Sequence, residues 1–281
     1  MIGKYKLIVF DLDGTLLTSE KILTPRVLKA IDNVRKRGMR ITISTGRSFP
    51  SAKPYIELLG IEGPASTQNG ALILSLKPKE IYRLITFPVG KLKVMLKAAK
   101  ELELFPILFI PSFNVPYIFM ERDYPQKSVF NFYFEKAVKK AILLENILDA
   151  LRIGRSFNEL VVVGKLESVN KFIRIFRGED LSFVMNSVYE GEAFLEVYGP
   201  ECSKRISLEF FAEFYGISLD QIIFVGDNLN DLDAIVSAGL GVAMENAPNM
   251  VKKSADVVIP SNEDEGVARF LEEIVEKSKI A

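Results

Sequence analysis

The sequence feature that most constrains the fold is a short apolar run that stops at two acidic residues. Lys6 is followed by the apolar residues 7–10, LIVF, and the run ends at Asp11 and Asp13 before a turn at Gly14. Such a run is typical of a central parallel strand that is covered on both faces. Ligands of open α/β sheets bind outside the carboxyl ends of these strands. The pattern therefore places both acids at a candidate site, although a solvated strand end before a simple Asp-Gly turn would give the same residues.

The same alternation of strand and helix recurs at both ends of the chain. Thr24 and Pro25 predict the start of a helix that ends at Gly38, and Asn69-Gly70 predicts the turn of a hairpin over 65–75. Further strands are predicted at 40–44, 81–87, 222–225, 241–244 and 256–259, and further helices at 203–215 and 267–277. Because this alternation lies on both sides of a different middle region, we expect one parallel sheet assembled from two distant segments.

The middle region, about residues 86–196, reads as a separate α+β insertion that is rich in aromatic residues. Helices are predicted at 89–103, 136–151 and 166–176, and strands at 105–111, 116–120, 160–163, 181–185 and 194–198. The aromatic side chains are expected to form mainly the insertion's own core, and secondarily a substrate wall. We therefore predict a core domain of residues 1–85 and 197–281, with a cap domain of residues 86–196 inserted into it.

Composition excludes several kinds of chemistry. Lys+Arg and Asp+Glu both number 36, so the net charge of zero gives no case for a nucleic-acid or anionic-membrane partner. The chain has no histidine and a single cysteine, Cys202, which excludes a Ser-His-Asp or Cys-His arrangement, a His-ligated zinc site and an intrachain disulfide. A metal would be held by oxygen atoms, which favours Mg²⁺ or a similar hard cation.

With no signal segment and no apolar run of membrane-spanning length, we expect a soluble, cytoplasmic protein. The sequence carries no indication of the oligomeric state.

Four motifs occur together at the predicted strand and helix ends. They are DLDGT at 11–15, STGR at 44–47, Lys204, and GDNLND at 226–231. In order and spacing they resemble the haloacid dehalogenase superfamily of phosphotransferases. The tail at 241–271 and the NGA at 69–71 are similar to the Cof-type subfamily, whose large α/β cap is inserted between the second and third motifs. The resemblance implies a Rossmann-like parallel-sheet core with an inserted α+β cap.

The resemblance implies a role for each acidic residue, and simple electrostatics supports it. A phosphate monoester is dianionic, so a carboxylate attacks its phosphorus only if a cation cancels the repulsion. Asp11 would be the nucleophile and a metal ligand, and Asp13 the general acid and base, with its backbone carbonyl on the metal. Asp227 would supply the second carboxylate. Asp231 would hold the metal through water or through another ligand, although a charge in the first turn of a helix is an alternative reading.

A second group of residues is expected to bind the phosphoryl oxygens. Lys204 and Thr45 would do so with their side chains, and Leu12 and Gly46 with their backbone N–H groups. In the family, the position of Asn230 also contacts the phosphoryl group. Lys204 could instead be a solvated lysine at a helix start, and Thr45-Gly46 an ordinary loop.

We therefore expect a magnesium-dependent phosphatase that acts on small phosphorylated metabolites through an aspartyl-phosphate, with sugar phosphates favoured by the resemblance. A phosphomutase or phosphotransferase that uses the same intermediate is the open alternative, and a non-catalytic phospho-ligand sensor or a receiver domain is a lesser one. A dehalogenase would need neither Asp13 nor Asp227. Arg47 is either a substrate contact or an ion-pair partner, and Cys202 is expected to take no part in the chemistry.

Overall fold

The computed structural model describes residues 3–153 and 156–277. They form two compact units, one made of residues 3–82 and 203–277 and the other of the described residues between 83 and 202. The insertion expected at 86–196 lies within the second unit. None of the helices in the described part of the chain is both long and apolar enough to span a membrane.

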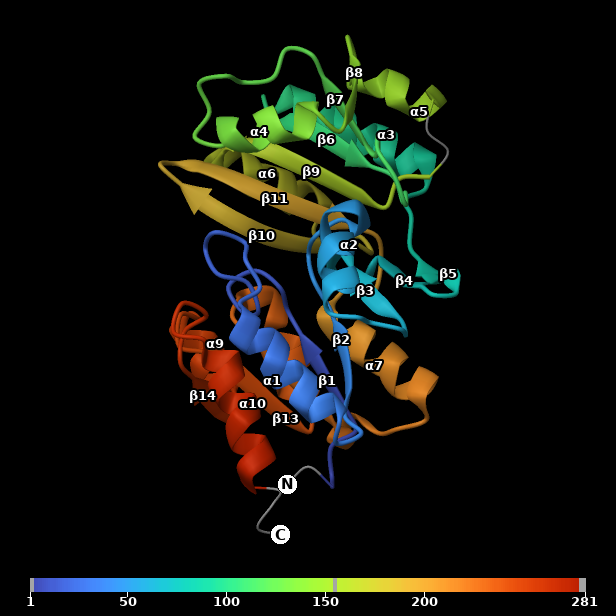
Figure 1. Cartoon of the computed structure of the whole chain (residues 1–281). Coiled ribbons are helices and arrows are strands. Elements are labelled where there is room, and N and C mark those ends of the chain that lie inside the picture. The colour runs from blue at the N-terminus through green and yellow to red at the C-terminus, as the bar shows by residue number, and fades with distance from the viewer. Residues whose placement is uncertain (1–2, 154–155, 278–281) are drawn as a thin grey trace. The chain divides into compact units, whose positions relative to one another are not determined.

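The first unit is built on a parallel sheet whose strands come from both ends of the chain (Figure 1). In spatial order these strands are β14 (Val257–Ile259), β13 (Leu240–Met244), β12 (Ile222–Gly226), β1 (Leu7–Phe10) and β2 (Arg40–Ile43). Leu7 is in register with Ile222 on one side and with Arg40 on the other. All four residues of β1 are buried, as expected for a central strand. The predicted assembly of one sheet from two distant segments is therefore confirmed.

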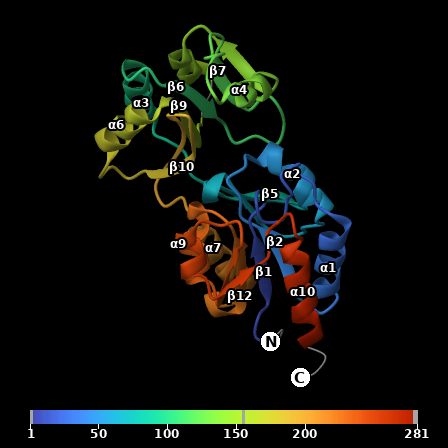
Figure 2. The same ribbon diagram turned by 90° about the vertical axis from the view of Figure 1, so that its left-hand side faces the viewer.

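Helices cover both faces of this sheet, as Figure 2 shows. The helices of this unit are α1 (Pro25–Arg35), α2 (Phe49–Leu58), α7 (Lys204–Tyr215), α8 (Leu232–Ser237), α9 (Asn249–Ser254) and α10 (Gly266–Lys277), with 3₁₀ turns η1 (Gln68–Gly70), η3 (Leu219–Gln221) and η4 (Leu229–Asp231). Helices α1 and α10 pack side by side. Helices α7 and α8 bury their apolar residues with Leu7 and Val9 of β1 on one face of the sheet. The predicted start of α1 is confirmed, because Thr24 accepts a hydrogen bond from the Val27 N–H and Pro25 is the first helical residue.

A small antiparallel sheet follows α2. Its strands are β3 (Ala65–Thr67), β4 (Leu72–Leu76) and β5 (Lys79–Leu84), and β5 runs across the boundary between the two units. The turn between β3 and β4 contains Asn69, whose φ of 51° lies in the left-handed region that asparagine tolerates better than most residues. The hairpin predicted from Asn69-Gly70 is therefore present.

The second unit contains a mixed six-stranded sheet. In spatial order its strands are β10 (Ser182–Tyr189), β11 (Glu192–Tyr198), β9 (Glu159–Lys165), β6 (Phe105–Phe109), β7 (Ile118–Glu121) and β8 (Ala141–Leu144). Its helices are α3 (Val89–Glu101), α4 (Asn131–Val138), α5 (Ala150–Ile153) and α6 (Leu166–Phe176), with a 3₁₀ turn η2 (Ile147–Asp149). Strand β9 divides the core: Leu160 and Val162 face the cluster of α3 and α6, whereas Val161 and Val163 face the cluster of α4.

One predicted element of this unit is wrong. The apolar spacing predicts a single helix over 136–151, but the chain there forms the end of α4, strand β8, η2 and the start of α5. The four residues AILL of β8 pair in parallel with β7. A short apolar run of this kind fits a strand or a helix equally well, and pairing with β7 decides between them.

Candidate active site

The site is built where neighbouring parallel strands end. Asp11 directly follows β1, and its backbone N–H donates a 2.9 Å hydrogen bond to the carbonyl of Val225 in β12. Asp227 directly follows β12. Because β1 and β12 are parallel neighbours in register, their carboxyl ends meet and the two acidic side chains lie close together. Residues that are far apart in the sequence are thus brought to one point at the edge of the sheet.

The turn after β1 packs directly against Asp227. Gly14 has a φ of +76°, and a Cβ atom at this position would overlap the carboxylate of Asp227. Thr15 donates a 2.9 Å hydrogen bond from its hydroxyl to Oδ1 of Asp227. Asn246 donates from its side-chain amide to the carbonyl of Gly14, at 2.9 Å. A glycine is therefore required here both by the backbone conformation and by the space that the acid occupies.

Lys204 joins the nucleophile candidate Asp11 to Asp231 of the fourth motif, GDNLND. It is the first residue of α7, whose preceding residue Ser203 caps the helix by accepting from the Ile206 N–H. Its Nζ donates to Oδ1 of Asp11 at 2.8 Å and to Oδ1 of Asp231 at 2.5 Å. The side chains of Lys204 and Asp231 are 1% and 0% exposed, so this lysine is not the solvated one that the alternative reading allowed.

Asp231 also fixes the loop that carries Asp227. Its Oδ2 accepts hydrogen bonds from the backbone N–H groups of Asp227 and Asn228, at 3.0 and 2.9 Å. Both oxygens of Asp231 are therefore engaged within the protein, one by the loop and one by Lys204. This buried acid orients its neighbours and is not the solvated helix charge that the alternative reading allowed.

The acidic cluster holds more negative charge than its one lysine balances. Ligand oxygens of Asp11, Asp227 and Asp231 all lie within 4.8 Å of one another. Burial raises the pKa of Asp11 to about 8, with Lys204 opposing the shift and the charges of Asp231 and Asp227 adding to it. Burial and the charge of Asp231 likewise raise the pKa of Asp227 to about 7, against the hydrogen bond from Thr15. Burial alone would lower the pKa of Lys204, but its two carboxylate partners raise it above the ordinary value and keep the amine charged.

Three residues of the predicted phosphate-binding group are joined through Asn69, to which the sequence analysis gave no role at the site. Thr45 follows β2, next to β1 in the sheet, and Asn69 donates from its backbone N–H to the carbonyl of Thr45 at 3.1 Å. A Cβ atom at Gly46 would lie 3.2 Å from the amide of Asn69, and Asn230 donates to the Asn69 side chain at 2.9 Å. Leu12 is buried beside Asp11 in the turn after β1.

The carboxylate of Asp13 contacts a separate pair of cations, Arg47 and Lys21. Arg47 donates to its carboxylate from Nε and Nη2, at 2.5 and 2.7 Å, and Lys21 Nζ lies 2.7 Å from Oδ1. Burial alone would raise the pKa of Asp13, but the hydrogen bonds and charges of Arg47 and Lys21 lower it to about 2. Of the two readings of Arg47, the structure therefore contains the ion pair.

Four residues of this site were not assigned a role from the sequence. Thr15 and Asn69 lie inside the DLDGT and NGA motifs, so the motifs were the available signal. Asn246 lies in the tail that resembles the Cof type. For Lys21, a lysine in a polar loop, no signal existed.

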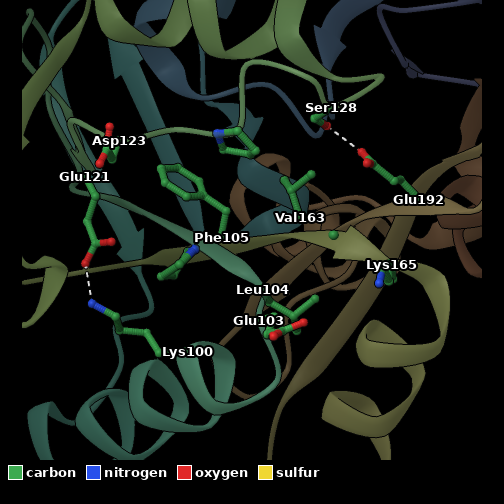
Figure 3. A pocket seen from close by; sticks show the side chains of 13 residues that line it. Lys100, Glu103, Leu104, Phe105, Glu121, Asp123, Ser128, Val163, Lys165 and Glu192 are labelled. Carbon is green, nitrogen blue, oxygen red and sulfur yellow. Dashed lines mark hydrogen bonds and ion pairs between the residues drawn. The ribbon is translucent and has the colours of Figure 1, made fainter.

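The described part of the second unit contains a pocket of about 410 Å³, but none of the predicted site residues lines it (Figure 3). Lys100 donates to Glu121 at 2.7 Å on one side of the pocket, and Ser128 donates to Glu192 on the other. Cys202, also in this unit, is buried, and burial raises its pKa to about 12. A thiol with such a pKa stays protonated at neutral pH, in keeping with its expected lack of a chemical role.

Comparison with known proteins agrees with this geometry. The haloacid dehalogenase-like hydrolase family matches residues 8–271. The chain is 27% identical over 292 residues to the 5-amino-6-(5-phospho-D-ribitylamino)uracil phosphatase YitU of Bacillus subtilis, covering 97% of this chain and 98% of the relative. It is 24% identical over 279 residues to the pyridoxal phosphate phosphatase YbhA of Escherichia coli, covering 95% of this chain and 97% of the relative.

A solved structure has a similar fold. A haloacid dehalogenase-like hydrolase from Bacteroides thetaiotaomicron superimposes with a TM-score of 0.81 at 27% identity, covering 96% of this chain and 100% of that one. The chain therefore belongs to the haloacid dehalogenase-like hydrolases, within their Cof-type phosphatases, and is a phosphoric monoester hydrolase.

Proposed function

We propose that the protein is a magnesium-dependent phosphatase that hydrolyses small phosphorylated metabolites, such as sugar phosphates, through an aspartyl-phosphate on Asp11. The observation that carries this proposal is the position of Asp11, which is held by Lys204 and lies in one cluster with Asp227 and Asp231. A carboxylate that is oriented by a buried amine and flanked by other acids is suited to attack phosphorus once the surplus charge is balanced.

The residues present fit a divalent cation. The cluster offers only oxygen ligands, which Mg²⁺ prefers. Burial and the neighbouring carboxylates raise the pKa of Asp11 and Asp227, so a bound cation would stabilise their ionised forms. Asp11, Asp227 and the backbone carbonyl of Asp13 would hold the ion, with Asp231 orienting the loop around it. When bound, the ion would supply charge neutralisation for the phosphoryl oxygens.

The reaction would run in two displacements. In the first, a carboxylate oxygen of Asp11 bonds to phosphorus while the ester P–O bond breaks. Asp13 would give a proton to the departing oxygen, so that a neutral alcohol leaves. Because Arg47 and Lys21 hold the pKa of Asp13 at about 2, it would take up this proton only when the anionic substrate offsets their charge. In the second, Asp13 takes a proton from water while the water oxygen bonds to phosphorus, and Asp11 departs as a carboxylate with release of inorganic phosphate. Lys204 would stay charged throughout, because Asp11 and Asp231 raise its pKa.

The remaining motif residues would hold the phosphoryl oxygens. We assign this role to the side chains of Thr45, Lys204 and Asn230 and to the backbone N–H groups of Leu12 and Gly46. Asn69 would keep the amide of Asn230 in place through their 2.9 Å hydrogen bond. These groups come from strand ends and helix starts of the first unit, which are rigid supports for oriented donors.

Small substrates are favoured by the relatives and by the second unit. The names of both phosphatase relatives refer to small phosphorylated compounds. We propose that residues 83–202 act as the cap that selects the substrate, since an inserted lid would exclude water and bulky phosphoproteins.

A phosphomutase that uses the same aspartyl-phosphate is the second candidate. It differs in product, because it gives an isomeric ester without net release of phosphate.

The decisive test is a screen of phosphate esters with and without Mg²⁺, using the wild type and Asp11→Asn. We expect free phosphate, no isomeric product, and a loss of turnover in Asp11→Asn of more than about 10³-fold with an unchanged fold. Asp32→Asn, which changes an exposed acid of α1, is the matched control and should keep full activity. Turnover near the wild-type rate in Asp11→Asn would remove Asp11 as the nucleophile, and an isomeric product would favour the mutase.

A further inference from the structure

The side chain of Asn246, in the loop that follows β13, joins the loops that follow three other strands of the parallel sheet. Its Nδ2 donates to the carbonyl of Gly14, after β1, at 2.9 Å and to Oδ2 of Asp227, after β12, at 3.5 Å. Its Oδ1 accepts from the backbone N–H of Asn262, after β14, at 3.3 Å. Because β14, β13, β12 and β1 are parallel neighbours, their carboxyl ends lie at one edge of the sheet, where a single amide reaches all three loops.

The contact with Gly14 restrains a residue that is otherwise free to rotate. Gly14 has a φ of +76°, and Asp227 occupies the space that a Cβ atom would need. Glycine has the most mobile backbone of all residues, so this position combines a required conformation with little intrinsic stiffness. The peptide that enters Gly14 carries the carbonyl of Asp13, one of the proposed metal ligands. The hydrogen bond from Asn246 to the next carbonyl therefore restrains this ligand as well.

Asp227 is restrained on both of its carboxylate oxygens. Thr15 donates to Oδ1 at 2.9 Å, and Asn246 donates to Oδ2 at 3.5 Å. Each carboxylate oxygen has about two acceptor positions, so these bonds fix the direction of the group and still leave a position on each oxygen for a cation.

We infer that Asn246 is a positioning residue that sets the affinity of the site for Mg²⁺, because it restrains Asp227 directly and the carbonyl of Asp13 through Gly14. Loss of a residue that orients a metal ligand typically weakens metal binding by about 10- to 100-fold. Asn246 is exposed, so its replacement should leave the fold intact. This inference rests on the proposed function, in which the ion is held by these ligands.

The test is a calorimetric titration of the metal-free protein with Mg²⁺, without substrate. In Asn246→Ala we expect the Kd for Mg²⁺ to rise at least about tenfold, while the melting temperature of the metal-free protein stays close to the wild-type value. In the phosphatase assay, the Mg²⁺ concentration that gives half the maximal rate should rise in the same proportion. The kcat at saturating Mg²⁺ should stay within about threefold of the wild type. A lower kcat at every Mg²⁺ concentration, with an unchanged Kd, would overturn the inference.

A matched asparagine lies in the neighbouring loop. Asn262 donates from its side chain to the carbonyl of Leu17 at 2.8 Å, but its contact with Asn246 is made by its backbone N–H. Asn262→Ala thus removes a bond to the loop after β1 and keeps the contacts of Asn246, so the Kd should stay close to the wild-type value. An equal rise in both variants would show that the loop as a whole, and not Asn246, sets the affinity. Asn249→Ala, at the exposed start of α9, is the surface control and should change neither Kd nor kcat.

The outcomes separate this inference from the proposed function. Asp227→Asn removes a proposed ligand and should abolish measurable binding. Wild-type affinity in Asp227→Asn, or a wild type that binds no Mg²⁺, would remove the proposed metal site and this inference with it. If Asp227→Asn abolishes binding but Asn246→Ala binds as tightly as the wild type, the proposed site stands and the inference alone is overturned.

Discussion

Lys204 is the residue on which the buried charges of the site depend. Its amine donates one hydrogen bond to Asp11 and one to Asp231, and its charge neutralises part of the negative charge of the acidic cluster. A buried ion pair is costly to form, yet removal of one partner costs more, because the other charge is left without compensation. The position of this lysine at the first turn of α7 therefore couples the stability of the first unit to the arrangement of its candidate nucleophile.

We expect Lys204→Met to lower the free energy of unfolding of the metal-free protein by about 3 kcal/mol, because two buried carboxylates lose their partner. Phosphatase activity should fall by more than about 10²-fold. Urea denaturation and phosphate release measure the two effects. Lys253→Met, at an exposed lysine of α9, should change neither, and wild-type stability in Lys204→Met would contradict this account.

The raised pKa values of the acids predict how metal binding depends on pH. The pKa of Asp11 is raised to about 8 and that of Asp227 to about 7, and a cation binds their ionised forms. Affinity for Mg²⁺ should therefore rise from about pH 6 to about pH 9 with release of protons, which calorimetry in buffers of different ionisation enthalpy detects. Without the ion, both acids bind protons more tightly folded than unfolded, so stability should fall as the pH rises from their ordinary pKa through these raised values. An affinity independent of pH would contradict the assignment of both ligands.

Helix ends show what the sequence could and could not predict at the scale of elements. Thr24-Pro25 predicted the start of α1, because capping depends on neighbouring residues, and the helix predicted over 203–215 placed the start of α7 within one residue. The run AILL of β8 was misread, because only its pairing with β7 makes it a strand. The motif residues Asp11, Lys204 and Asp227 could be named in advance. The ion pair between Lys21 and Asp13 could not be predicted, because it depends on how the loop at 18–22 folds back.

The two capping residues give a matched pair of substitutions. Thr24→Ala and Ser203→Ala each remove a hydroxyl that accepts a backbone N–H, and each should lower the free energy of unfolding by about 1 kcal/mol. Only Ser203→Ala should also lower kcat, because α7 begins with Lys204 whereas the helix capped by Thr24 carries none of the proposed site residues. Equal kcat in the two variants would show that the start of α7 does not position the lysine.

At the scale of the molecule, the chain leaves and re-enters the first unit through adjacent segments. Within the second unit, Arg83 donates to the carbonyl of Glu201 at 3.2 Å, and a Cβ atom at Gly199 would collide with Ile85. The first and last residues of this unit thus run side by side. It also has two apolar clusters of its own, one on each face of its sheet.

We therefore expect residues 83–202 to fold in isolation, because the unit has its own core and its ends already meet. Circular dichroism should show a single cooperative thermal transition, and the near-ultraviolet signal should be that of packed aromatic side chains. A gradual transition with exposed apolar surface would show that the unit needs the rest of the chain. Insertion of a proline into β9, between the two clusters, is the control that should abolish the transition.

The place of β1 in its sheet has a consequence for synthesis on the ribosome. This strand lies between β2, which follows it closely in the chain, and β12, which is translated only after the whole of the second unit. Until then one side of an entirely apolar strand has no hydrogen-bonding partner, and such an edge attracts other nascent chains. The growing polypeptide must therefore shield β1, with a chaperone or with temporary contacts of its own, for most of the time that its translation takes.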